Sequence, residues 1–72
     1  MFRRTIGDKI RMHRVAQGLT QAELGEKCGM ADSQIGVYER NECIPKEKNL
    51  RRIAEALGVS YDDINAEKGG IQ

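Results

Sequence analysis

The sequence lacks the features that mark membrane, secreted and disulfide-rich proteins. It contains no stretch of eighteen apolar residues and no N-terminal signal segment, so no membrane association is expected. The chain is therefore expected in the cytoplasm, a reducing compartment, and no disulfide is expected between its two cysteines, Cys28 and Cys43, which lie in unrelated contexts. At 72 residues the chain is expected to fold as one domain around a single small core.

The chain also lacks a strong net charge. Its formal charge is +1, which argues against indiscriminate coating of nucleic acid. The charge is uneven, however: residues 1–18 sum to +4, residues 19–49 to −2 and residues 50–72 to −1. The basic N-terminal segment leaves room for a local phosphate-binding face. Its cations are either solvated helix charges or an arm that contacts phosphate, and both interpretations remain open for Arg3, Arg4, Lys9 and Arg11.

Sustained alternation of apolar and polar residues is absent, so no β-sheet is expected, whereas helix start signals are frequent. Thr5 with Asp8 resembles a capping box, in which the side chain of the first residue accepts an otherwise unpaired amide. A second capping box begins at Thr20, and Ser60 starts a short last helix. Glycines are expected to end the first, second and fourth helices, at Gly18, Gly29 and Gly58.

A third helix is expected over about residues 32–40, and Pro45 is expected at the entrance of the fourth, where its missing amide costs nothing. The pattern therefore predicts an all-α fold, a compact five-helix bundle. We expect one domain over residues 1–68 with its core in residues 5–65, followed by a flexible tail over residues 69–72.

Residues 21–40 meet the requirements of a helix-turn-helix at fixed spacing. A small residue is needed where the two helices approach most closely, and Gly25 is there. A residue that tolerates positive φ is needed in the turn, and Gly29 is there. Apolar residues must point into the core before, within and after the turn, and they are Leu24, Cys28, Met30, Ile35 and Tyr38.

The segments "GLTQAEL", "YERN" and "LGVSYDDI" extend this pattern over residues 6–64, nearly the whole chain. In these segments the sequence resembles the phage repressor and Cro family, XRE-type regulators with a five-helix, lambda-repressor-like DNA-binding domain. The resemblance implies that the third helix enters the major groove of double-stranded DNA. It also implies that the start of the second helix abuts the phosphate backbone, where free amides and the helix dipole favour an anion.

Carried over to this sequence, the resemblance implies three sets of functional residues. The residues expected to reach base edges are Ala31, Asp32, Ser33, Gln34 and Val37. The residues expected to contact phosphates are Thr20, Gln21, Arg40, Asn41, Lys46 and Lys48. Arg14 and Glu39 match positions that form a partly buried ion pair in relatives, which joins the first helix to the third.

Several residues depart from the family pattern. Ala31 stands where relatives often have a capping Ser or Thr, so Asp32 either caps the third helix or accepts from cytosine N4 in the groove. Gln34 is able to pair bidentately with adenine, and Val37 suits a thymine methyl. Asn41 replaces a usual glycine and can itself adopt the left-handed cap conformation. Asp32 and Glu42 bring negative charge to the expected interface.

No residue pattern predicts a metal, a cofactor, a small-molecule ligand or catalysis. His13 has no partner at ligand spacing and is interpreted as a half-buried structural residue. Cys28 is expected in the core and Cys43 as an exposed loop thiol, and Tyr61 and Ile64 as core or dimer contacts. No nucleophile–base pair, phosphate-cradling glycine loop or paired-carboxylate site is present, so the chain is not expected to be an enzyme.

The sequence predicts a DNA-binding transcriptional regulator, a small repressor that acts as a homodimer. One recognition helix reads little sequence, so two copies about one DNA turn apart are expected. The dimer surface is expected to involve the fifth helix and the loop before it. The alternative is a protein-interaction module on the same fold, adaptor or antitoxin-like, with weak or no DNA binding. The near-neutral charge together with Asp32 and Glu42 motivates this alternative.

Overall fold

Five helices follow one another in the computed structural model, which describes residues 5–65. They are α1 (Ile6–Ala16), α2 (Gln21–Cys28), α3 (Asp32–Glu39), α4 (Glu47–Leu57) and α5 (Tyr61–Ile64). No strand occurs between residues 5 and 65, so the predicted all-α, five-helix fold is confirmed. The expected tail over residues 69–72, and Arg3 and Arg4 of the basic segment, lie outside the described residues.

Local side-chain caps explain where three of the helices begin. The Asp8 amide donates to Thr5 Oγ1 over 3.1 Å, and the Asp8 side chain accepts from the Thr5 amide in return. The Glu23 amide donates to Thr20 Oγ1 over 3.0 Å in the second reciprocal box. At α5 the Ser60 hydroxyl accepts from the amide three residues on. All three predicted starts are confirmed, because each depends only on residues three apart.

Helix ends follow the sequence almost as closely. Gly29 and Gly58 cap α2 and α4 in the left-handed conformation, with φ of 76° and 73°. After α3, Asn41 adopts φ 62°, as predicted for a residue that replaces a glycine there. The first helix ends at Ala16, with Gln17 as its cap residue, shortly before the predicted stop at the next glycine.

Pro45 lies at the entrance of α4, as predicted, but outside its first turn. Helix α4 begins at Glu47 and takes Lys46 as its N-cap residue, so the proline precedes the cap. Pro45 is nevertheless buried, as is Leu50 in the first turn. These two residues occupy the positions of a hydrophobic staple, which fixes the angle at which the chain enters a helix. Burial of the ring, rather than its missing amide, explains this location.

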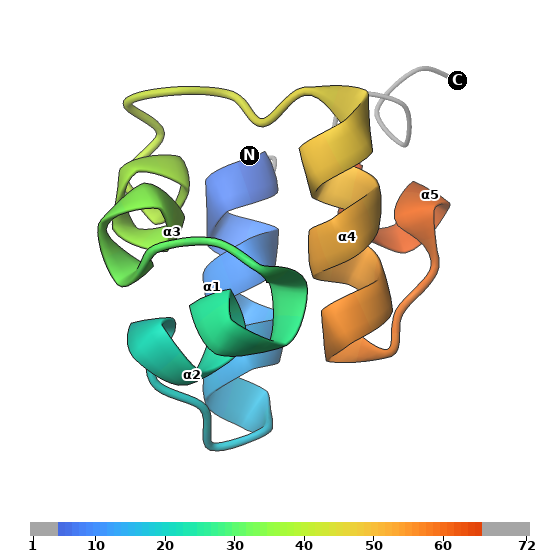
Figure 1. Ribbon diagram of the computed structural model, residues 1–72. Coiled ribbons are helices and arrows are strands. Elements are labelled where there is room, and N and C mark those ends of the chain that lie inside the picture. The colour runs from blue at the N-terminus through green and yellow to red at the C-terminus, as the bar shows by residue number, and fades with distance from the viewer. Residues whose placement is uncertain (1–4, 66–72) are drawn as a thin grey trace.

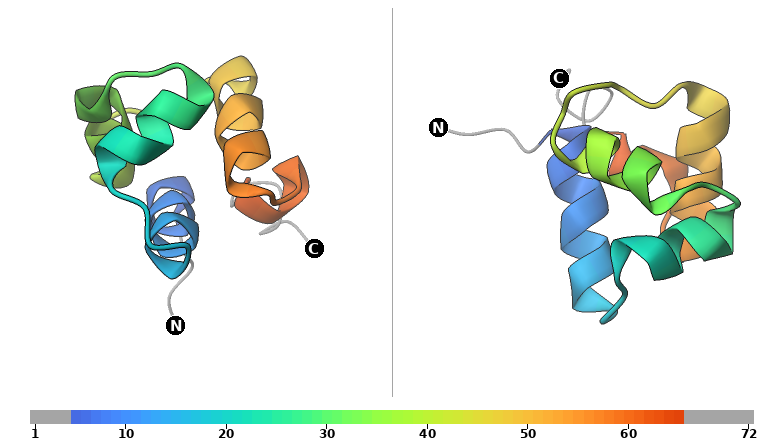
Figure 2. Two further views of the ribbon diagram at one scale, coloured as in Figure 1. Left: turned by 60° about the horizontal axis from the view of Figure 1, so that its bottom comes forward. Right: turned by 60° about the vertical axis from the view of Figure 1, so that its left-hand side comes forward.

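The helices form two groups around a shared core (Figure 1). Helix α2 packs against α3 and also against α4, while α1 contacts α3, α4 and α5. In the left view of Figure 2, α2 and α3 cross at a steep angle at the upper left, α4 and α5 lie at the right, and α1 lies below them. The loop over residues 40–46 runs from the end of α3 to the start of α4 along one edge (Figure 1). This arrangement leaves one side of α3 facing outwards.

One apolar cluster fills the space between these helices. Its buried members are Ile6, Ile10, Leu24, Cys28, Ile35, Tyr38, Leu50, Ile53, Ala54, Leu57 and Ile64. The expected core positions of Cys28 and Ile64 are confirmed, and His13 is half-buried as expected. Each fully buried isoleucine or leucine among them contributes roughly 1.5–3 kcal/mol relative to exposure. The helix-turn-helix therefore packs on a core to which all five helices contribute.

Two contacts tie the short α5 to the rest of the domain. The Lys9 ammonium on α1 donates to the backbone carbonyl of Asp63 over 2.9 Å. The Arg51 guanidinium on α4 lies over the Tyr61 ring at 4.3 Å from its centroid, within cation–π range. Lys9, one of the basic residues left open by the sequence, thus has an internal contact with α5.

Candidate nucleic-acid interface

The turn between α2 and α3 brings backbone against backbone. A Cβ atom placed on Gly25 would lie 2.4 Å from the carbonyl oxygen of Met30, closer than real Cβ contacts. The Met30 amide in turn donates to the Gly25 carbonyl over 2.8 Å. Only glycine fits this crossing, as the spacing of the motif predicted. The turn fixes where the first residues of α3 lie relative to α2.

Helix α3 presents one face to the core and its leading residues to solvent. Ile35, Gly36, Tyr38 and Glu39 are buried. Of the residues predicted to read bases, three are exposed and two half-buried: Ala31, Asp32 and Ser33, then Gln34 and Val37. The predicted readout residues are therefore brought together on the outward side of one short helix.

The structure corrects one of the two roles considered for Asp32. Ala31 is the N-cap residue of α3, and the helix has no side-chain capping hydrogen bond. Asp32 is already the first helical residue, one position too late to cap the free amides as an N-cap side chain does. Its carboxylate still lies in the first turn, where the helix dipole favours negative charge. Asp32 is thus an exposed carboxylate at the leading end of α3 that does not cap the helix.

The start of α2 combines a cap with the expected phosphate-binding position. The capping box satisfies the amides of Thr20 and Glu23. The amides of Gln21 and Ala22 have no intrahelical acceptor at these positions. Two predicted phosphate contacts, Thr20 and Gln21, therefore lie at a helix start of the kind that favours anions.

A buried carboxylate joins α1, α2 and α3. Arg14 Nε donates to Glu39 Oε2 over 2.6 Å and Arg14 Nη2 to Oε1 over 3.1 Å, so the expected pair is present and bidentate. Its side chains are only 12% and 4% exposed, and the bond to Glu39 raises the Arg14 pKa above its ordinary value. Gln21 Nε2 also donates to Glu39 Oε1, over 3.1 Å. The sequence did not predict this last bond, which gives Gln21 a role inside the domain.

A second network joins α3 to α4 and was also not predicted. Gln34 Nε2 donates to the Tyr38 hydroxyl over 2.8 Å, and Asn49 Nδ2 donates to the same oxygen over 3.1 Å. Gln34 is one helical turn before Tyr38 on α3, and Asn49 lies in the first turn of α4. A predicted base-reading side chain is therefore attached, through a buried tyrosine, to another helix.

The charges after α3 partly cancel one another. Arg40 Nε donates to Glu42 Oε2 over 3.0 Å, and both side chains are more than half exposed. The hydrogen bond to Arg40 lowers the Glu42 pKa and raises the Arg40 pKa, so both groups remain ionised near neutral pH. Asn41, predicted to contact phosphate, places its side-chain oxygen close to Gly7 on α1. Of these two expected phosphate contacts, Arg40 is paired with a carboxylate, and Asn41 is exposed with its side-chain oxygen beside α1.

Lys46 and Lys48 are exposed where the loop meets α4, and neither has an ion pair between residues 5 and 65. In the middle of α3, a Cβ on Gly36 would lie 3.0 Å from Arg40 Nη1 and 3.3 Å from Gln21 Oε1. The predicted phosphate contacts of α2 and of the loop after α3 therefore approach each other across this glycine.

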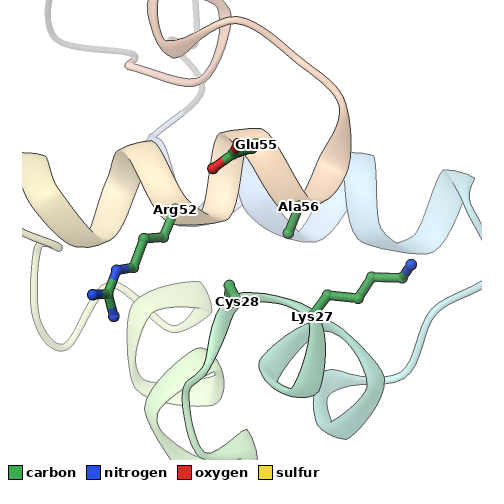
Figure 3. A pocket seen from close by; sticks show the side chains of 5 residues that line it. All are labelled: Lys27, Cys28, Arg52, Glu55 and Ala56. Carbon is green, nitrogen blue, oxygen red and sulfur yellow. The ribbon is translucent and has the colours of Figure 1, made fainter.

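A shallow groove on another face lies between α2 and α4 (Figure 3). Lys27, Cys28, Arg52, Glu55 and Ala56 line it. Burial raises the pKa of the Cys28 thiol, which disfavours the reactive thiolate. Within residues 5–65 no group of three His, Cys, Asp or Glu side chains could hold a metal ion. In the same range, no helix is both long and apolar enough to span a bilayer.

Known proteins share this arrangement. The chain matches the helix-turn-helix family HTH_3 over residues 10–64. It is 33% identical over 64 residues to an immunity repressor of Bacillus phage phi105, covering 89% of this chain and 44% of that protein. It is similarly 34% identical to the regulator SinR of Bacillus subtilis, with coverage of 88% and 58%. The chain thus spans about half the length of the curated relatives it matches.

Solved structures agree with this relationship. The P22 c2 repressor bound to a synthetic operator superimposes with a TM-score of 0.80 at 33% identity, over 85% of this chain and 92% of that one. SinR in complex with DNA superimposes with a TM-score of 0.79 at 33% identity, covering 83% and 97%. The crossing of α2 and α3, the exposed leading end of α3 and the matched residues place this chain in the HTH_3 helix-turn-helix family.

Proposed function

We propose that the protein is a sequence-specific DNA-binding transcriptional regulator, a small repressor that reads the major groove with α3. The exposed leading end of α3, set beside the free amides of α2, carries this proposal. A helix of this size fits the major groove, and a helix start favours a phosphate. The similarity to domains solved on operator DNA supports the same function.

The proposal assigns base contacts and phosphate contacts to different residues. Bases are read by Ala31, Asp32, Ser33, Gln34 and Val37. Phosphates are held by Thr20, Gln21, Arg40, Asn41, Lys46 and Lys48. In this assignment Glu42 and a phosphate compete for Arg40, because the Arg40 guanidinium already binds the Glu42 carboxylate. The two lysines carry no such competitor.

We also propose that two copies bind together, as a homodimer on two half-sites. One copy offers five proposed readout residues, which is little for a genome-scale search. The free thiols Cys28 and Cys43 suit a reducing compartment, which we take to be the cytoplasm. No catalytic role is assigned.

The salt dependence of binding to duplex DNA tests the proposal. Release of counterions by three cations from each of two copies gives a slope of about −5 in log K against log salt. Lys46→Gln and Lys48→Gln are each expected to flatten this slope by about one per copy. Lys27→Gln, a matched exposed lysine in the groove between α2 and α4, leaves it unchanged.

The alternative function is a protein-interaction module on the same fold. The Arg40–Glu42 pair and the exposed Asp32 favour it, because both reduce attraction to a polyanion. The wild-type protein would then bind duplex DNA weakly and independently of salt, and would select no sequence from a random pool. That result would contradict the regulator and favour the interaction module.

A further inference from the structure

We infer that Tyr38 and Asn49 are positioning residues that set which base Gln34 reads. The inference rests on the proposed function, since it requires that α3 enter the major groove. Gln34 Nε2 donates to the Tyr38 hydroxyl over 2.8 Å, and Asn49 Nδ2 donates to that oxygen over 3.1 Å. Neither Tyr38 nor Asn49 was predicted to take part in recognition.

Tyr38 is well suited to hold another side chain still. Its residue is only 5% exposed and belongs to the apolar core, so its ring has one position. A phenol oxygen can accept hydrogen bonds as well as donate one. Here it accepts from two side-chain amides, that of Gln34 on α3 and that of Asn49 on α4. The hydroxyl is therefore fixed from two sides and gives Gln34 a stationary acceptor.

This anchor determines the order of donor and acceptor that Gln34 presents. A glutamine amide has two N–H donors and one carbonyl oxygen, and without a partner it can turn over and exchange them. With one N–H bonded to Tyr38, the amide keeps its nitrogen on the tyrosine side. The remaining N–H and the carbonyl oxygen form one edge, which can donate to adenine N7 and accept from adenine N6. An amide that is free to turn can instead direct its donors at the acceptors of guanine.

Asn49 acts one step further away. It lies in the first turn of α4, next to the proposed phosphate-binding residue Lys48. Its bond to Tyr38 crosses from α4 to α3, so it fixes the hydroxyl relative to the loop between these helices. The base-reading amide and the proposed backbone-contacting loop are thereby held in one register. Loss of Asn49 leaves the Gln34–Tyr38 bond but frees the hydroxyl to rotate.

The test compares base preference rather than affinity alone. Wild-type protein first selects a duplex from a random pool, and each base pair of that duplex is then substituted singly. Gln34→Ala is expected to reduce the preference for one base pair in each half-site roughly tenfold or more. Tyr38→Phe is expected to reduce the preference at the same base pair by roughly three- to tenfold, with other positions unchanged. Asn49→Ala is expected to have a smaller effect at that position.

A double substitution and a matched control separate positioning from general damage. If Tyr38 acts through Gln34, then Tyr38→Phe changes no base preference in the Gln34→Ala background. Tyr61→Phe removes the other tyrosine hydroxyl, which stands on α5 under Arg51, and should alter no preference. Thermal unfolding of each variant shows whether the domain is intact at the temperature of the measurement.

The possible failures are distinguishable. If wild-type protein selects a duplex but Tyr38→Phe weakens all sequences equally, or changes none, the positioning inference is wrong while the proposed function stands. If Tyr38→Phe and Gln34→Ala act at different base pairs, the inference is also wrong. If wild-type protein selects no duplex, the proposed function and the inference fail together.

Discussion

At the scale of single residues, the buried carboxylate of Glu39 is where substitution should have its largest effect. It is the one buried charged residue between residues 5 and 65. Its carboxylate accepts from Arg14 on α1 and from Gln21 on α2, so three helices meet at one negative charge. A buried ion pair contributes little net stability, but removing one partner leaves the other charge buried without compensation. The network therefore specifies how α3 is oriented more than it stabilises the fold.

Arg14→Met tests this account of the buried pair. The substitution keeps much of the side-chain volume but leaves Glu39 with Gln21 alone, and should lower the free energy of unfolding by about 3–5 kcal/mol. Arg40→Met is the matched control, because its pair with Glu42 is more than half exposed on both sides. The control should cost at most about 1 kcal/mol. Urea unfolding measures both, and equal losses would contradict the account.

Glu42→Gln tests whether the exposed pair restrains DNA binding. The substitution frees the Arg40 guanidinium for a phosphate, so affinity for duplex DNA should rise and the salt slope should steepen by about one per copy. Glu55→Gln, which removes a carboxylate from the groove between α2 and α4 on another face, is the control and should leave both unchanged. Weaker binding by Glu42→Gln would show that the carboxylate assists the interface.

The pH dependence of the same pair has a definite sign. Because Arg40 holds the Glu42 pKa below its ordinary value of 4.5, the carboxylate stays ionised from pH 7 down to pH 5. The pairing is thus fully present above the ordinary carboxyl pKa and is lost only as the pH falls through the lowered value. Glu42→Gln should therefore change DNA affinity by the same factor at pH 5.5 and at pH 7.5. A difference that vanishes at pH 5.5 would mean that the carboxylate is protonated there.

At the scale of helices, the sequence predicted features that depend on residues close in the chain. The starts at Thr5, Thr20 and Ser60 were correct because each capping contact joins residues three apart. The bonds of Gln21 to Glu39 and of Asn49 to Tyr38 were not predicted, because they join residues 18 and 11 positions apart on separate helices. Periodicity shows which face is buried but not which polar side chains meet there.

The uncapped start of α3 gives a prediction about stability. Ala31 already has the extended conformation of an N-cap residue, with φ −72° and ψ 151°, but has no side-chain oxygen. Ala31→Ser supplies one and should raise the free energy of unfolding by about 1 kcal/mol. Thr20→Ala removes the corresponding oxygen from α2 and should lower it by a similar amount, about 1 kcal/mol. Thermal unfolding measures both changes. An unchanged or lowered Tm for Ala31→Ser would show that this helix start cannot accept a cap.

Two buried glycines should respond in opposite directions to alanine. On Gly25 the added methyl meets the Met30 backbone at 2.4 Å, and Gly25→Ala should cost about 1–3 kcal/mol because backbone cannot move aside. On Gly36 the nearest atoms belong to the side chains of Arg40 and Gln21. The exposed Arg40 can move, so Gly36→Ala should stabilise α3 by up to about 1 kcal/mol through helix propensity. Chemical denaturation of the two variants side by side would reject this account if Gly36→Ala were the more damaging.

At the scale of the whole molecule, charge and size both favour action in pairs. The net charge of +1 gives one copy little long-range attraction to DNA. The unpaired lysines of the proposed interface supply only local attraction, and the proposed readout by α3 covers only a few bases. Two copies on one duplex double both the phosphate contacts and the base contacts. Each mismatched base pair then costs about 1–3 kcal/mol in either half-site, which is enough to distinguish an operator from bulk DNA.

Paired binding predicts the form of the selected DNA. Sites enriched from a random pool should contain two half-sites related by a two-fold axis, with centres about one helical turn, roughly 10–10.5 base pairs, or a multiple of it apart. Native mass spectrometry of the complex should give two chains per duplex. Inserting five base pairs between the half-sites turns one of them to the opposite side of the DNA and should abolish paired binding. Enriched sites with one half-site, occupied by one chain and indifferent to the insertion, would establish that a single copy is the DNA-binding unit.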